Sequence, residues 1–133
     1  MDTMADRDRE RLKQMRDGLL RLHKSLLDSE RAVYERDVER ITSAGQYLGL
    51  VMDDPFFAWL RELSQFIVMI DETLDLKEPD GLAGADRLIA QARGLISPSE
   101  TGNRFARRYW EVMQADPAIV LAHRDIVKIF ESL

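Results

Sequence analysis

The chain has 133 residues, of which 45% are apolar and 32% charged, and its 24 acidic against 19 basic side chains give a formal net charge of −5. This length suits one domain with one hydrophobic core, and the composition is too apolar for a disordered chain and too charged for a membrane-spanning one. The lack of cysteine excludes a disulfide framework, a thiolate metal site and a cysteine nucleophile. The negative charge argues against a general affinity for nucleic-acid phosphates.

The N-terminal ten residues have neither the basic start nor the apolar stretch of a signal peptide. The longest apolar runs, such as 66–70, are far shorter than the roughly 20 residues of a membrane-spanning helix. We therefore expect a cytoplasmic location and no membrane contact.

The N-terminal third predicts one long helix from about Ala5 to Ile41, because this stretch has no proline and Gly18 as its only glycine. Apolar residues recur along it at spacings of three, four and seven, as on a core-facing helix: Leu12, Leu19, Leu22, Leu26 and Val33. Residues 1–12 carry closely mixed acids and bases with almost no apolar face. We expect this end to fray or to find a partner.

A second row beside that stripe alternates apolar and polar side chains: Leu20, His23, Leu27, Glu30, Tyr34, Asp37 and Ile41. The helix is longer than one small core can cover. It therefore favours a homodimer, in which the partner copy covers this row, or a complex with another protein.

Two helices are predicted next. Ser43 and Gln46 form a capping box for a short helix over Ala44–Met52. Asp54 and Pro55 start a longer one to about Leu74. Apolar side chains at Trp59, Phe66, Val68 and Met69 widen its apolar face, so we expect 55–74 to be the central, most buried helix.

Three further helices complete the chain. A turn cluster over 77–81, with Asp80 as cap, predicts a helix over Gly81–Ile96. The Ser97-Pro98-Ser99-Glu100 sequence combines a capping box with proline at the first helical position and predicts a helix to about Ala115. Asp116 caps the last, over Pro117–Ser132. No segment alternates like a strand.

These elements predict a single all-α domain over residues 1–133, a compact bundle of five to six helices. In it, helix 55–74 is wrapped by the N-terminal helix and by the last two helices, and the segments 44–52 and 81–96 are short connectors.

A candidate ligand pocket lies between the first helix and helix 55–74. His23, Glu30 and Tyr34 share one stripe at spacings of seven and four. The first two suit proton transfer and the tyrosine suits hydrogen bonding. Asp71 can pair with His23 or with an arginine in a pocket roofed by Trp59. The alternative is that His23, Glu30 and Tyr34 are hydrogen-bonded polar tips at the edge of the core or at a helix interface, and that Asp71 forms an ordinary ion pair between helices.

A candidate basic patch consists of Arg104, Arg107 and Arg108, with Tyr109 and Trp110 beside them. Such a cluster can hold phosphate or a nucleic-acid backbone. The alternative is that the aromatic residues pack while the arginines face solvent. The net charge and the lack of a recognition-helix motif make nucleic acid the less favoured partner.

The common nucleotide-binding and hydrolase signatures are absent from the sequence. Carboxylate-bridged metal bundles need Glu-x-x-His on two helices, whereas Leu20 and Val120 stand three positions before the two histidines. We expect no metal and no cofactor.

Four segments carry a resemblance to a known family: Leu22–Arg31, Asp54–Arg61, Ile70–Glu72 and Gln114–Pro117. Together they resemble a family of small bacterial all-helical proteins, a domain of unknown function. The resemblance covers about Arg21 to Leu133 and leaves out the charged segment before Leu12. It implies a bacterial source and a compact helical fold, and it implies no activity.

Three classes of function remain open. The first is a non-enzymatic interaction or regulatory module. The second is a small-ligand-binding protein or enzyme that uses the pocket residues His23, Glu30, Tyr34, Trp59 and Asp71. The third is nucleic-acid binding through Arg104, Arg107 and Arg108. We rank them in that order.

Overall fold

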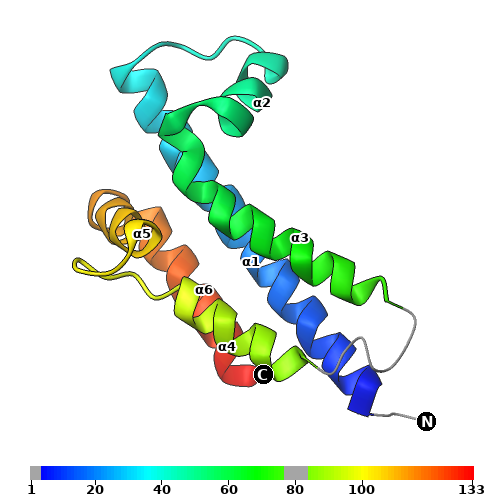
Figure 1. Ribbon diagram of the computed structural model, residues 1–133. Helices are drawn as coiled ribbons and strands as arrows, with labels where there is room; N and C mark the ends of the chain where they lie inside the picture. Colours follow the sequence, from blue (N-terminus) through cyan, green and yellow to red (C-terminus); the bar gives the residue numbers. More distant parts are fainter. Residues whose placement is uncertain (1–3, 77–83) are drawn as a thin grey trace.

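The computed structural model describes residues 4–76 and 84–133, and every regular element in these two ranges is helical (Figure 1). In chain order the elements are α1 (Met4–Asp37), α2 (Ala44–Asp53), the 3-10 helix η1 (Pro55–Leu60), α3 (Arg61–Leu74), α4 (Ala85–Leu95), α5 (Arg104–Ala115) and α6 (Pro117–Ser132). The predicted all-α class with a long N-terminal helix is confirmed. None of the helices within the described ranges is long and apolar enough to cross a membrane.

Three helix starts have the predicted caps. The Ser43 hydroxyl accepts a hydrogen bond from the amide of Gln46 (3.1 Å), and the Asp54 carboxylate accepts one from Phe56 (2.8 Å). The Asp116 carboxylate caps α6. Each side chain satisfies an amide that the first turn of a helix leaves without a partner.

One predicted start is wrong. Helix α5 begins at Arg104 and is capped by Asn103, well beyond Ser97, where we placed the capping box. The intervening chain folds back as a loop, in which the amide of Ser99 donates to the carbonyl of Ala106 (3.1 Å). Helix α4 begins at Ala85, while the predicted Asp80 cap lies outside the described residues.

Helix α1, and not the segment 55–74, is the central element. It packs against α3, α4, α6 and η1. The predicted single helix over 55–74 is a 3-10 helix followed by α3, whose main neighbours are α1, η1 and α4. Val68 and Met69 are exposed, because α3 buries one narrow stripe rather than the broad face we expected.

The charged N-terminal end of α1 is anchored rather than frayed. Arg9 donates hydrogen bonds to the carbonyls of Leu74 and Leu76 at the end of α3. Arg11 donates to the carbonyl of Leu133 and pairs with Asp86 of α4. Carbonyls at a helix C-terminus lack partners within the helix and favour positive charge. We expected these side chains to have little to pack against. Instead, they bind α3, α4 and α6 to the N-terminal end of α1.

The second row of α1 is covered largely by the chain itself. Tyr34 packs edge-on against Phe56, with ring centres 5.4 Å apart, and Ile41 is buried. Glu30 is 1% exposed, whereas Leu20 remains 46% exposed. A second copy is thus not needed to bury most of this row, and the homodimer stays a prediction.

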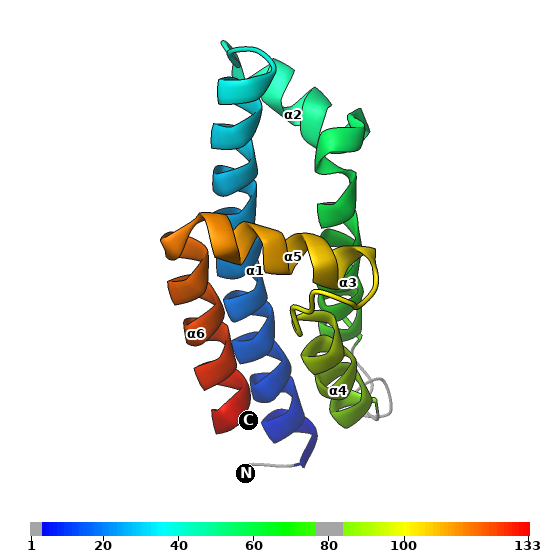
Figure 2. The same cartoon turned by 90° about the vertical axis from the view of Figure 1, so that its left-hand side faces the viewer.

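Helix α5 lies across the other helices. Figure 1 views it along its axis and Figure 2 from the side, where it spans from α3 to α6. In Figure 2, α4 and α6 lie on one side of α5, and α2 with the upper half of α1 lies on the other. This crossing helix therefore separates two regions of the bundle.

A glycine sets the approach of α1 to α6. A Cβ atom built on Gly18 would lie 2.6 Å from Cδ1 of Ile129 and 2.7 Å from Cδ1 of Ile126. Both distances are shorter than ordinary van der Waals contact. A glycine inside a helix costs about 0.5–1 kcal/mol relative to alanine, so the close packing explains its presence at this buried position.

We predict that Gly18→Leu lowers the free energy of unfolding by about 1–3 kcal/mol, because the added atoms force α1 and α6 apart. Gly49→Leu is the matched control, since a Cβ at Gly49 of α2 meets no atom within 4 Å. Urea unfolding followed by circular dichroism measures both variants. Equal midpoints for the two would contradict the proposed role of Gly18.

Candidate functional site

The centre of the candidate site is the buried carboxylate of Glu30, in the C-terminal third of α1. Its Oε2 accepts a hydrogen bond from the indole Nε1 of Trp59 (2.9 Å). Arg108 of α5 donates to the same oxygen (3.3 Å) and, through its second nitrogen, to Oε1 (2.8 Å). A carboxylate removed from water requires such partners, because an unpaired buried charge is strongly unfavourable. The network joins α1, η1 and α5.

Arg108 continues the network to the surface. Its guanidinium also pairs with Glu111, one turn further along α5, at 3.0 Å. Burial disfavours the charge of Arg108, but the hydrogen bonds with Glu30 and Glu111 outweigh this effect and raise the pKa of the guanidinium. Arg108 is therefore a permanent cation held by two carboxylates.

A pocket of about 520 Å³ opens beside this network. Its walls come from α1, η1 and α5, and they are formed by Glu30, Phe56, Trp59, Arg104, Arg107, Arg108 and Glu111. This volume falls in the range of about 300–1,000 Å³ typical of small-molecule sites. The pocket unites residues that we had placed in two separate sets.

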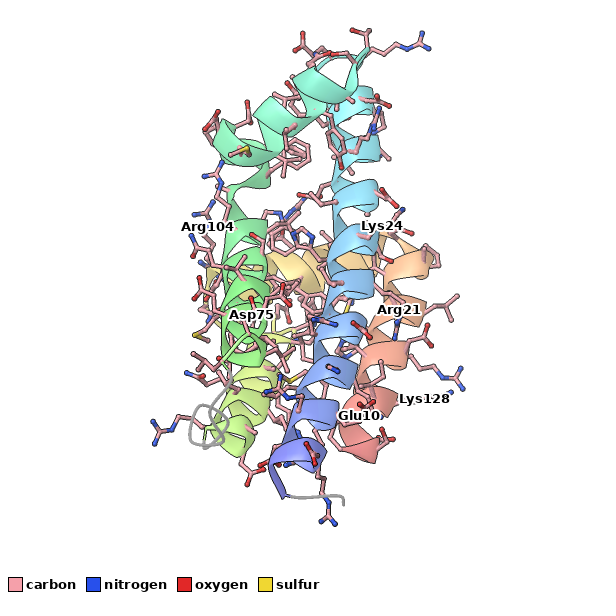
Figure 3. All side chains as sticks on the ribbon, turned by 90° about the vertical axis from the view of Figure 1, so that its right-hand side faces the viewer. Glu10, Arg21, Lys24, Asp75, Arg104 and Lys128 are labelled. Carbon is pink, nitrogen blue, oxygen red and sulfur yellow. The ribbon has the colours of Figure 1, made fainter. Side chains whose placement is uncertain are left out.

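Two arginines of the pocket have no partner within the described part of the chain. The side chains of Arg104 and Arg107 are exposed and make no hydrogen bond or ion pair there. They lie three positions apart on α5, and this spacing places neighbouring side chains on one helix face. Figure 3 shows Arg104 at the edge of the molecule beside α3, away from Glu10, Arg21 and Lys128. The pocket thus has two free cations, while its two carboxylates are both bound to Arg108.

The structure does not bring all five predicted pocket residues together. Only Glu30 and Trp59 share the pocket. Asp71 pairs with Arg16 at 3.1 Å on a surface where its side chain is 47% exposed. The phenol of Tyr34 reaches Glu39 at 3.4 Å, and its ring joins Phe56 and Phe57.

His23 lines a different, smaller cavity of about 230 Å³, together with Phe57, Leu60 and Arg61 among others. Burial lowers the pKa of its imidazole. It makes no hydrogen bond within the described ranges. His23 and Glu30, which we considered as a proton-transfer pair, therefore face separate cavities.

Sequence reasoning did not identify Phe56 and Glu111 as site residues, nor the pairing of Glu30 with Arg108. A carboxylate in a row that alternates apolar and polar side chains is a signal that Glu30 needs a cationic partner where the row is buried. Nothing in the sequence identifies that partner among 19 basic residues, because the choice depends on how α5 crosses α1. No group of three or more His, Asp or Glu side chains in the described ranges is arranged to hold a metal ion.

Comparison of the chain with family models, with curated proteins and with solved structures found no match. The resemblance to a bacterial family of helical proteins therefore stays a prediction.

We predict that Glu30→Ala lowers the free energy of unfolding by about 3 kcal/mol, since it leaves Arg108 and the indole of Trp59 without their buried acceptor. Glu111→Ala is the control: it removes the exposed partner of the same arginine and should change stability by about 0.5 kcal/mol or less. Urea unfolding measures both. Similar losses in the two variants would contradict the central role of Glu30.

Proposed function

We propose that the chain is a non-enzymatic regulatory module that binds a small anionic molecule in the pocket between α1, η1 and α5. The observation that carries this proposal is the pair Arg104 and Arg107, which remain without a partner in the described part of the chain, beside a pocket whose carboxylates are already bound. Guanidinium groups recognise phosphate and carboxylate through charge-assisted hydrogen bonds.

The charges of the pocket favour a ligand with two negative charges. Arg108 is neutralised by Glu30 and Glu111, so Arg104 and Arg107 provide the attraction. The ring of Phe56, which lines the same pocket, offers an apolar surface beside them. An organic phosphate with a planar or apolar portion satisfies both features.

Binding is favoured over catalysis because the one buried acid of the pocket is already engaged. Both oxygens of Glu30 accept hydrogen bonds from Trp59 or Arg108. A general base must reach the proton that it removes, whereas the carboxylate of Glu30 is 1% exposed and has about one of its four acceptor positions left. Glu30 has the role of a structural anion in this arrangement.

We predict that phenyl phosphate raises the thermal unfolding midpoint by several degrees, because a ligand that binds only the folded state stabilises it. The Arg104→Ala/Arg107→Ala double variant should lose this effect, with a dissociation constant raised at least about tenfold. Inorganic phosphate serves as the second probe and reports whether the apolar portion contributes. Calorimetric titration measures the affinities.

The control for that experiment is Arg87→Ala/Arg124→Ala, which removes two exposed arginines that do not line the pocket. It should bind phenyl phosphate as the wild type does. Equal weakening in both double variants would show a general charge effect and would remove the proposed site.

Nucleic acid is the alternative ligand for the same arginines, since Arg104 and Arg107 are exposed. Because Arg108 is paired with Glu30, two rather than three arginines are available to bind phosphates. The net charge of −5 also repels a polyanion. Salt-sensitive binding of a single-stranded RNA, lost in Arg104→Ala/Arg107→Ala, would favour this alternative. Absence of binding at low salt would exclude it.

We also propose that two copies associate, with the cytoplasm as their location. The support for a dimer is the set of apolar side chains exposed on α2 and α3, namely Leu48, Met52, Val68 and Met69. Gel filtration with light scattering should give twice the mass of 15.4 kDa. A mass of one chain at every concentration tested would contradict association.

A further inference from the structure

A second cavity, of about 510 Å³, lies between the end of α4 and α6. It is formed by Arg93, Ile96, Ser97, Pro98, His123, Val127, Phe130 and Glu131. In Figure 2 these two helices lie on the side of α5 opposite to α2 and the upper half of α1. The cavity shares no residue with the pocket of Arg104 and Arg107, so a ligand bound here is independent of the proposed function.

His123 is held in one tautomer by a buried tyrosine. The hydroxyl of Tyr109, which is 0% exposed, lies 2.7 Å from Nδ1 of His123. Burial raises the pKa of the phenol, so Tyr109 keeps its proton, and burial lowers the pKa of the imidazole. His123 Nδ1 is the one acceptor for this hydroxyl in the described part of the chain. Tyr109 therefore donates to Nδ1, and the neutral ring carries its hydrogen on Nε2.

The Nε2–H group of His123 is free to bind a ligand. It has no hydrogen-bond partner within the described ranges. In those ranges, the one buried side-chain nitrogen or oxygen without a partner is Nε of Arg61. Nε2 of His123 is therefore accessible rather than buried. An unpaired donor that remains accessible, on a ring that lines the cavity, can meet an acceptor bound there.

A cation lies on the wall of the same cavity. The guanidinium of Arg93 lies 5.7 Å from the centre of the Phe130 ring, and its Nη2 donates to the carbonyl of Phe130 (3.0 Å). These contacts position the guanidinium, and its other N–H groups make no hydrogen bond in the described part of the chain. Glu131 is exposed and can turn its carboxylate to water.

Apart from Ser97, whose hydroxyl donates to the carbonyl of Arg93, the rest of the wall is apolar. Ile96 and Phe130 contribute side chains that are 4% and 5% exposed, and Pro98 and Val127 add further apolar surface. An apolar cavity with a few convergent donors is the usual form of a site for a small amphipathic molecule. The two donors identified, a neutral N–H and a guanidinium, both suit a carboxylate.

We propose that this cavity binds a small apolar monocarboxylic acid, with its carboxylate between His123 Nε2 and Arg93 and its hydrocarbon portion against Ile96, Val127 and Phe130. The class includes medium-chain fatty acids and aryl carboxylic acids.

The test uses octanoate as the probe. Acetate, which has the carboxylate without the long chain, and 1-octanol, which has the chain without the carboxylate, are the two control compounds. Titrations are followed by the imidazole ¹⁵N resonances of His123 and by calorimetry. Octanoate should shift the His123 resonances and bind at least about tenfold more tightly than either acetate or 1-octanol, since each half lacks one set of contacts. Equal binding of 1-octanol and octanoate would overturn the carboxylate assignment.

Matched variants locate the site. Val127→Trp fills the cavity and should abolish the octanoate response, while Val120→Trp on the exposed side of α6 should retain it. Arg93→Gln should weaken octanoate about tenfold and leave 1-octanol unchanged. The Arg104→Ala/Arg107→Ala variant should bind octanoate normally. An octanoate response that survives Val127→Trp, or no response in the wild type, would overturn the proposal.

Discussion

The buried carboxylate of Glu30 is the constraint on which the arrangement of α1, η1 and α5 depends. A charge that is 1% exposed is tolerated only where donors replace water. Those donors come from Trp59 and from Arg108, 78 residues further along the chain. Their geometry fixes where η1 and α5 lie against α1. Hydrogen bonds require particular distances and angles, whereas apolar contacts allow many arrangements. The network therefore defines the position of α5 on α1 more narrowly than the apolar contacts around it.

A line of aromatic rings extends this constraint across α5. Trp59 contacts Phe105 with ring centres 5.3 Å apart, Phe105 contacts Tyr109 at 5.9 Å, and Tyr109 contacts His123 at 5.4 Å. Helix α5 thus connects η1 to α6 through its buried face. Two consecutive residues of α5 lie at the two cavities: Arg108 lines the pocket of Arg104 and Arg107, and the hydroxyl of Tyr109 contacts His123 in the wall of the other.

The sequence predicted the class of the fold and most helix boundaries, because apolar spacing and caps are local signals. Ser43, Asp54 and Asp116 cap the helices as expected. Packing order is not local: α1 is central because its apolar stripe meets several helices, and Arg9 and Arg11 also bind the ends of α3 and α6. The same limit applies to the candidate site. Glu30 and Trp59 were identified as one set and Arg104, Arg107 and Arg108 as another, and only the crossing of α5 over α1 unites them.

The three arginines of α5 show how position along a helix divides chemically identical side chains into different roles. Arg104 and Arg108 are four residues apart and share a face, yet only Arg108 lies within reach of Glu30. Its charge is paired with the buried carboxylate of Glu30 and with the exposed carboxylate of Glu111. Arg104 and Arg107, nearer the start of α5, form no ion pair with either carboxylate. A polar network that used all three arginines would leave no exposed arginine without a partner beside the pocket. Arg104 and Arg107 therefore remain exposed in the wall of the pocket because the buried network includes Arg108 alone among the three.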